Sequence, residues 1–155
     1  YAEGNIMASD ALQELADQIH REVMPEMEEV TATIVTFDDM YGDMQLTVWV
    51  SAGQGDVYLV DRKRFLNMAG NAAAMNLQPL VDSGALHVEG LDLTGGMAQD
   101  GEGGQKELLG IPADSLTRLE AYGLTVKDKV LCVLVNNGND PYAVKFLDYL
   151  VTNMR

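Results

Sequence analysis

The chain has 155 residues, a hydrophobic content of 47% and a formal net charge of −14 at pH 7. This length suits a single domain, residues 1–155, and no apolar run approaches the roughly 18 residues of a membrane-spanning helix. The negative charge disfavours nucleic acids and anionic membrane surfaces as partners, because both would be repelled. The chain has a single cysteine, Cys132, which excludes an internal disulfide framework and a cysteine-based zinc site.

The first third of the chain predicts a strand, a helix and a second strand. Residues 1–7 are consistent with the end of a first strand. Ser9 or Asp10 can cap a following helix, which Pro25 ends. The apolar residues on one face of that helix are Leu12, Leu15, Ala16, Ile19 and Val23. Residues 30–36 alternate and are rich in β-branched side chains, which predicts a strand.

The segment 40–53 allows two interpretations. The residues that alternate as in a strand are Met44, Leu46, Val48 and Val50, and the Gly-Gln-Gly that follows could form a hairpin turn. The residues that share one face of a helix are Tyr41, Met44, Val48 and Ala52. A helix would supply the crossover that two parallel strands require. We predict the helix.

The rest of the chain alternates between strands and helices. We predict, in order, a strand at 56–61, a helix at 62–75, a turn at 77–80, a strand at 85–93, a flexible glycine-rich loop at 94–105, a short helix at 112–121, a strand at 130–135 covered on both faces, and a last helix capped by Asp140 with Pro141 at its first position. This alternation predicts an α/β fold, namely a three-layer α/β/α sandwich around a mostly parallel sheet of four to five strands.

Two segments resemble bacterial extracellular solute-binding proteins. The first is the Gly-Asp-Val strand of residues 55–61, followed by Phe65 and the Leu-Gln-Pro-Leu turn at 77–80. The second is the strand and the Ala-x-x-Phe-x-x-x-Leu helix within residues 133–150. Together they cover about a third of the chain. The chain is most similar to one lobe of the two-lobed, type II binding-protein fold, as found in membrane-anchored proteins of clostridial-type Gram-positive bacteria.

The resemblance implies a sheet order of 2-1-3-n-4, in which residues 130–135 form the antiparallel inserted strand. It also implies a helix at 40–53. Only about 45 residues separate Ala85 from Lys129, far fewer than the roughly 100 of an independent lobe. The chain therefore lacks the second lobe that would close over a solute.

The function implied is that of a noncatalytic, extracytoplasmic domain with a sensing or interaction role at the cell surface. A segment upstream of Tyr1 would attach it to the membrane, and a small molecule or a protein would be its partner. A first alternative is a binding protein for a sugar, an amino acid or a peptide in a transport system. A second alternative is an unrecognised enzyme that uses Asp38 or Asp61 as acid or base.

The sequence lacks a recognisable catalytic arrangement, and we expect no metal and no cofactor. The two histidines, His20 and His87, fall on a helix and in a predicted strand, where solvated side chains are expected. No calcium-loop order of carboxylates occurs. If a small molecule binds, a parallel sheet would place it outside the carboxyl ends of the strands. The candidate ligand-binding residues at those ends are Ser9, Asp38, Asp61 and Arg62.

Overall fold

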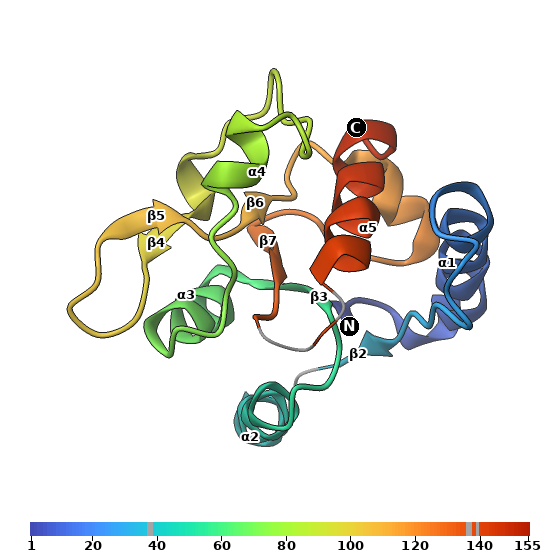
Figure 1. The fold of residues 1–155 in the computed structure, drawn as a ribbon. Helices are drawn as coiled ribbons and strands as arrows, with labels where there is room; N and C mark the ends of the chain where they lie inside the picture. The colour runs from blue at the N-terminus through green and yellow to red at the C-terminus, as the bar shows by residue number, and fades with distance from the viewer. Residues whose placement is uncertain (37–38, 136–137, 139) are drawn as a thin grey trace.

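The computed structural model describes residues 1–36, 39–135, 138 and 140–155 (Figure 1). Asp38, one of the predicted ligand-binding residues, lies outside the described residues. The described chain combines a five-stranded sheet, a separate two-stranded hairpin and several helices. The predicted α/β class is confirmed.

Five short strands form the central sheet in the order β2-β1-β3-β7-β6. Their bounds are Ala2–Glu3 for β1, Ile34–Val35 for β2, Val57–Asp61 for β3, Ile111–Pro112 for β6 and Lys129–Val133 for β7. β1 pairs in parallel with β2 and β3, whereas β7 runs antiparallel to both β3 and β6. All strands of this sheet except β7 therefore share one direction, and β7 is the antiparallel strand expected beside β3.

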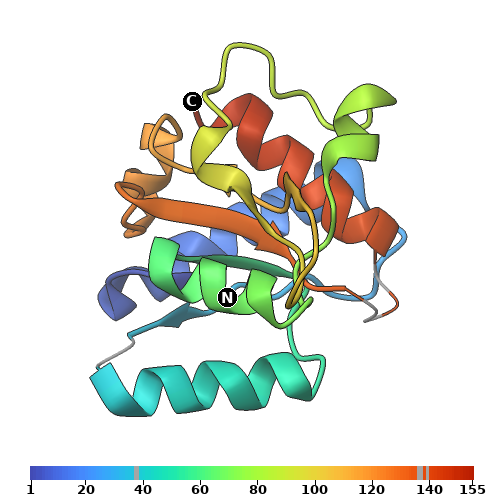
Figure 2. The same cartoon turned by 90° about the vertical axis from the view of Figure 1, so that its left-hand side faces the viewer.

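Helices cover both faces of this sheet. α1 (Ser9–Val23) and α5 (Asp140–Asn153) lie on one face, and α2 (Asp39–Ser51) and α3 (Arg62–Gly70) lie on the other. Figure 1 shows the sheet between α3 on one side and α5 and α1 on the other, and Figure 2 looks onto the side of α2 and α3. The chain therefore has the three layers that the alternating pattern predicted.

The central strand β3 needs this double cover because both of its faces are apolar. Tyr58 and Val60 pack in a cluster with Phe65 of α3, and Leu59 packs in the cluster that contains the buried residues of α1 and α5. Tyr58, Leu59 and Val60 are each at most 2% exposed. Burying a large apolar side chain stabilises a protein by about 1.5–3 kcal/mol, so helices on both faces are favoured.

α1 forms where the periodicity predicted it, after a short 3-10 helix, η1 (Ile6–Ala8). Its buried residues are Leu12, Leu15, Ala16 and Ile19. The predicted side-chain cap is wrong, because Ala8 occupies the N-cap position and makes no side-chain cap. Ser9 is the first helical residue, and its Oγ donates to the carbonyl of Ile6 at 2.7 Å.

The segment 40–53 forms α2, so the helical interpretation is correct. Leu46 is 3% exposed. The ring of Trp49 stacks on Tyr1, with 4.6 Å between centroids, and Tyr1 stacks on Tyr58 at 5.5 Å. Gly55 has a φ of +79°, and a Cβ at this position would collide with the Tyr1 ring. Glycine here therefore permits the aromatic stack that holds α2 against the sheet.

The opposite face of α2 is apolar and open to solvent. The residues on it are Met40, Tyr41, Met44 and Val48, with exposed fractions between 61% and 77%. α2 thus carries large apolar side chains on two sides, which explains why its sequence also alternates like a strand.

The predicted strand at 85–93 is wrong: these residues, all of them described, form turns and irregular structure. Leu86 and Val88, whose alternation suggested a strand, are both buried in the core on the α1 and α5 side. The backbone amide of His87 donates to the carboxylate of Asp148 on α5 at 2.8 Å. The Asp148 side chain of α5 thus accepts a backbone hydrogen bond that a neighbouring strand would otherwise accept.

Several other boundaries also differ from the predictions. The glycine-rich segment 94–105 contains the 3-10 helix η2 (Thr94–Gly96) and strand β4 (Met97–Gln99), which pairs antiparallel with β5 (Lys106–Leu108). The helix expected at 112–121 is a 3-10 helix, η3 (Thr117–Tyr122), because residues 111–112 belong to β6. A short helix, α4 (Gln78–Asp82), occupies part of the predicted turn.

Replacing Leu46 by alanine is expected to lower the free energy of unfolding by about 2–3 kcal/mol, because it empties a buried site. Met44→Ala, on the exposed side of the same helix, is the matched control and is expected to change it by less than about 0.5 kcal/mol. Urea denaturation measures both values. Equal losses in the two variants would contradict the orientation of α2.

Candidate functional site

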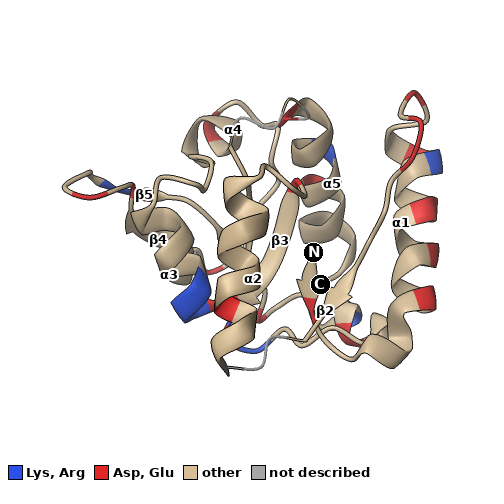
Figure 3. Ribbon diagram, turned by 90° about the horizontal axis from the view of Figure 1, so that it is seen from below, with Lys and Arg blue, Asp and Glu red and all other residues tan. Residues whose placement is uncertain are grey.

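The carboxyl edge of the parallel strands carries a network of charged side chains. Asp61, at the end of β3, caps α3, and its Oδ1 accepts from the backbone amide of Arg64 at 2.8 Å. The other oxygen of Asp61 accepts from the Arg64 guanidinium. Arg64 also donates through Nε to Asp43 of α2 at 2.8 Å. Figure 3 shows the basic start of α3 beside the acidic residue of α2.

The network extends to the neighbouring strands. Glu3, at the end of β1, pairs with Lys129 of β7 at 2.7 Å and lies 3.9 Å from Arg64. Burial by itself would lower the pKa of Arg64, but the carboxylates of Asp61 and Asp43 outweigh it and the pKa is raised. The side chain of Arg64 is only 12% exposed. These pairs therefore connect β1, β3, β7, α2 and α3 rather than leave a charged site open at this edge.

The other predicted site residues at this edge also make contacts within the chain. Arg62 donates from its guanidinium to the carbonyl of Gly95 at 3.0 Å, and Ser9 donates to Ile6. Ser9, Asp61 and Arg62 all follow the carboxyl ends of parallel strands, as expected. The structure brings Asp61 and Arg62 together at the start of α3, whereas Ser9 starts α1.

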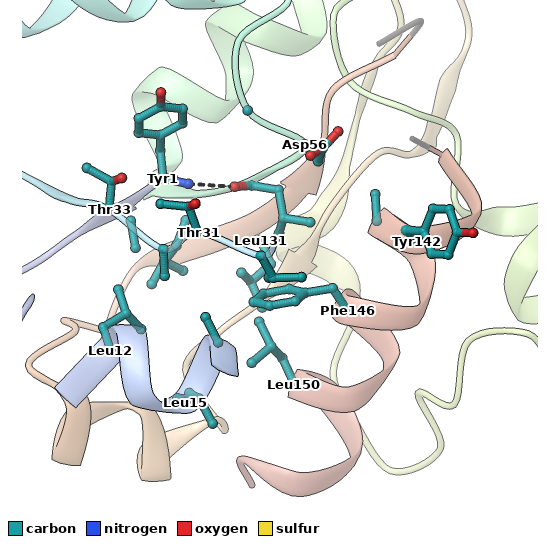
Figure 4. A pocket seen from close by; sticks show the side chains of 18 of the residues that line it. Tyr1, Leu12, Leu15, Thr31, Thr33, Asp56, Leu131, Tyr142, Phe146 and Leu150 are labelled. Carbon is teal, nitrogen blue, oxygen red and sulfur yellow. Dashed lines mark hydrogen bonds between the residues drawn. The ribbon is translucent and has the colours of Figure 1, made fainter. Parts of the chain in front are cut away.

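A cavity of about 360 Å³ lies at the opposite, amino edge of the sheet (Figure 4). It is enclosed by α1, α5, the starts of β1 and β3, and an irregular segment, residues 24–33, which we call the strap. The apolar side chains that line it include Leu12, Leu15, Leu131, Phe146 and Leu150. None of Ser9, Asp61 and Arg62 lines it.

The mouth of the cavity is more polar than its floor. Thr31 and Thr33 of the strap are exposed there, and Asp56 and Tyr142 are half-buried. Figure 4 shows Thr31, Thr33 and Asp56 on one side of the cavity and Leu12, Leu15 and Leu150 on the other, with Leu131 between them. Among the described lining residues, only Glu29 and Asp56 have charged side chains.

The strap is attached to α1 by side-chain hydrogen bonds. The amide group of Gln13 donates to the carbonyl of Val30 and accepts from the backbone amide of Ala32, both at 2.9 Å. The ring of His20 donates through Nε2 to the carbonyl of Met27 at 2.7 Å. The histidine expected to be solvated is therefore half-buried and holds the strap.

The remaining reactive groups have structural surroundings. His87 is 55% exposed and pairs with Asp148 at 3.0 Å, and its pKa is raised by this hydrogen bond and by the charge of Asp148. Cys132 is buried, which raises the pKa of its thiol to about 12 and keeps it protonated at neutral pH. It therefore fills the core.

The described residues offer neither a metal site nor a membrane-spanning helix. Residues 1–36, 39–135, 138 and 140–155 hold no group of three or more histidine, cysteine, aspartate or glutamate side chains placed to bind a metal ion. Within the same ranges, no helix combines the length and apolar character that crossing a membrane requires. The cavity is therefore the feature of the described chain that most resembles a binding site.

The sequence interpretation missed the cavity residues. It assigned Asp56, Thr31 and Thr33 only to predicted strands, at 56–61 and 30–36, and assigned no role to Glu29. A usable signal was Gln13, a polar residue seven positions before His20 on the same helix. Both side chains bind the strap, but their partners are distant enough in sequence that only the structure identifies them.

No protein-family model matches the chain, and no curated protein matches it with significance.

Gln13→Ala is expected to free the strap and accelerate hydrogen exchange of the Ala32 amide, because that amide loses its acceptor. The loss of two hydrogen bonds should also lower the free energy of unfolding by about 1–3 kcal/mol. Gln18→Ala is the matched control, since Gln18 lies on the same helix and binds Glu22 and Tyr149 instead. Exchange measured by NMR should change at Ala32 only in the first variant; unchanged exchange there would contradict the attachment.

Proposed function

We propose that this chain is a noncatalytic binding domain that takes a small, largely apolar ligand into the cavity between α1, α5 and the strap. The observation that supports this most directly is the volume and lining of that cavity. Ligand pockets are typically about 300–1,000 Å³, mostly apolar, with a few polar groups that orient the ligand. A cavity of about 360 Å³ is at the small end of this range.

The size limits the ligand to a compact molecule. A dry cavity of about 150 Å³ accepts one benzene ring, so this cavity has room for an aromatic ring or a branched chain with a short polar end. Its leucine floor disfavours sugars, because each hydroxyl group placed against apolar side chains would lose its hydrogen bonds to water. An apolar body with one polar end fits best.

We further propose that the domain acts outside the cytoplasm, attached to a membrane through a segment upstream of Tyr1, and that it is a single lobe related to extracellular solute-binding proteins. The resemblance of residues 55–80 and 133–150 supports this. The strand order β2-β1-β3-β7-β6 with an antiparallel β7 is compatible with it. A lobe without a partner lobe suits sensing or interaction better than transport.

The alternative of an enzyme that uses Asp61 has less support. Both oxygens of this carboxylate accept hydrogen bonds from Arg64. A general base must reach a substrate proton at hydrogen-bond distance, and Asp61 lies away from the cavity. The geometry therefore favours binding over acid–base chemistry.

Phenethyl alcohol, a neutral probe of suitable size, is expected to bind the cavity and shift the amide NMR signals of α1, α5 and the strap. Ala16 lines the cavity and is fully buried. Ala16→Leu should reduce the cavity volume and weaken binding at least tenfold, and it should lower the free energy of unfolding by about 1–3 kcal/mol because Ala16 is already packed. Ala143→Val tests the same point from α5 if the first variant is overpacked.

Ala121→Leu is the control for these variants, because Ala121 is exposed on η3 and does not line the cavity. It should bind the probe as the natural chain does. No binding by the natural chain, or equal binding in the filled variants, would overturn the proposed cavity function.

The proposed location is tested separately. The reading frame upstream of Tyr1 is expected to encode a hydrophobic segment of about 20 residues, the length that spans a bilayer as a helix. Sequencing the full gene, followed by protease accessibility of the tagged protein on intact cells, measures this. A frame that encodes no such segment would remove the proposed anchor without affecting the cavity.

A further inference from the structure

We infer that the ligand of the cavity is an organic cation, a small apolar molecule that carries a protonated amine. This inference rests on the proposed binding function and identifies the ligand class. Glu29 and Asp56 are the charged side chains among the described lining residues, and both are acidic. The floor opposite them is apolar (Figure 4).

Asp56 is the better placed of the two carboxylates. It comes directly before β3 and is half-buried, whereas Glu29 is exposed on the strap. A charge that is partly buried is less screened by salt than one on the open surface. A carboxylate has two oxygens with about four acceptor positions, so Asp56 can accept from an ammonium group in addition to its contacts within the chain. Hydrogen bonds between ionised groups are about twice as strong as neutral ones.

Aromatic rings among the lining residues suit the same ligand. Tyr142 and Phe146 of α5 both line the cavity, and Figure 4 shows the Phe146 ring beside Leu131. The Nζ of Lys145 lies 5.5 Å from the centroid of the Tyr142 ring, within the range of a cation–π interaction. Because the Tyr142 ring already has a cation beside it, Phe146 is the ring that a ligand ammonium would meet.

Lys145 does not make the mouth of the cavity positively charged. Its ammonium group pairs with Glu26 at 3.3 Å, and it does not line the cavity. Tyr1 also lines the cavity, and its α-amino group donates to the carbonyl of Val57 at 2.9 Å. Burial lowers the pKa of this amino group to about 6, so it is mostly uncharged at pH 7. An anionic ligand would then meet two carboxylates and no lining lysine, arginine or histidine among the described residues. The net charge of −14 also raises the local concentration of cations around the protein.

Three probes share a phenethyl group and differ only in the polar group at its end, so they show which polar group the cavity prefers. They are phenethylamine, phenethyl alcohol and hydrocinnamate. At pH 7 they carry an ammonium, a hydroxyl and a carboxylate group. The natural chain is expected to bind the amine at least tenfold more tightly than the alcohol and the carboxylate most weakly, as measured by NMR titration or calorimetry. Added salt should weaken the binding of the amine and leave that of the alcohol unchanged.

Two variants test which carboxylate binds the ammonium group of the amine probe. Asp56→Asn should weaken the amine at least tenfold and leave the alcohol within about twofold, and Glu29→Gln should weaken the amine by a smaller factor because Glu29 is more exposed. Glu28→Gln is the matched control, since Glu28 is an exposed neighbour that does not line the cavity. Melting temperatures show whether each variant is folded.

The outcomes distinguish this inference from the function on which it rests. If none of the three probes binds, both fail. If the alcohol binds as tightly as the amine, or if Asp56→Asn and Glu29→Gln behave like Glu28→Gln towards the amine, the cation inference is wrong while the cavity function stands. Selective loss of amine binding in Asp56→Asn supports both.

Discussion

The double-sided burial of β3 is the constraint on which the rest of the structure depends. Tyr58 and Val60 need cover from α2 and α3, and Leu59 needs cover from α1 and α5. If one face of this strand were exposed to solvent, the fold would lose about 1.5–3 kcal/mol of stability for each apolar side chain on that face. Parallel pairing of β1 with β3 then requires a crossover, and α2 supplies part of it. The three layers, and the space between α1 and α5 that becomes the cavity, follow from this requirement.

The two edges of the sheet are closed by different kinds of interaction. At the carboxyl edge, Arg64 links Asp61, Asp43 and Glu3, so the polar groups that usually face a ligand in parallel sheets are bound to one another. At the amino edge, hydrogen bonds from Gln13 and His20 hold the strap over apolar side chains. Each such bond contributes about 0.5–1.5 kcal/mol. The carboxyl edge is thus fixed by ion pairs, while the amino edge keeps an open cavity with an apolar floor.

Local patterns in the sequence correctly predicted the elements that are buried on one face only and those that are buried on both faces. α1 has a single apolar face, and β7 is apolar from Val130 to Val133, so the spacing of apolar residues identified the helix and an unbroken apolar run identified the strand. α2 was ambiguous because Leu46 is buried while Met44 and Val48 are large, apolar and exposed. The strand predicted at 85–93 failed because alternation of Leu86 and Val88 signals burial but cannot show that a partner strand exists. The cavity was beyond prediction because Gln13 and Val30, or Asp56 and Phe146, meet only through the tertiary fold.

The cavity lies inside the domain, under the strap, and not at the carboxyl edge of the sheet. In open parallel sheets ligands usually bind outside the carboxyl ends of the strands. In this chain the residues between β3 and β7 form a short hairpin, short helices and β6 rather than a lobe, and the carboxyl edge is occupied by its own ion pairs. The space under the strap has an apolar floor and a mouth that carries Thr31, Thr33, Asp56 and Tyr142. The ligand proposed above, an apolar body with a cationic end, would be removed from water in this space.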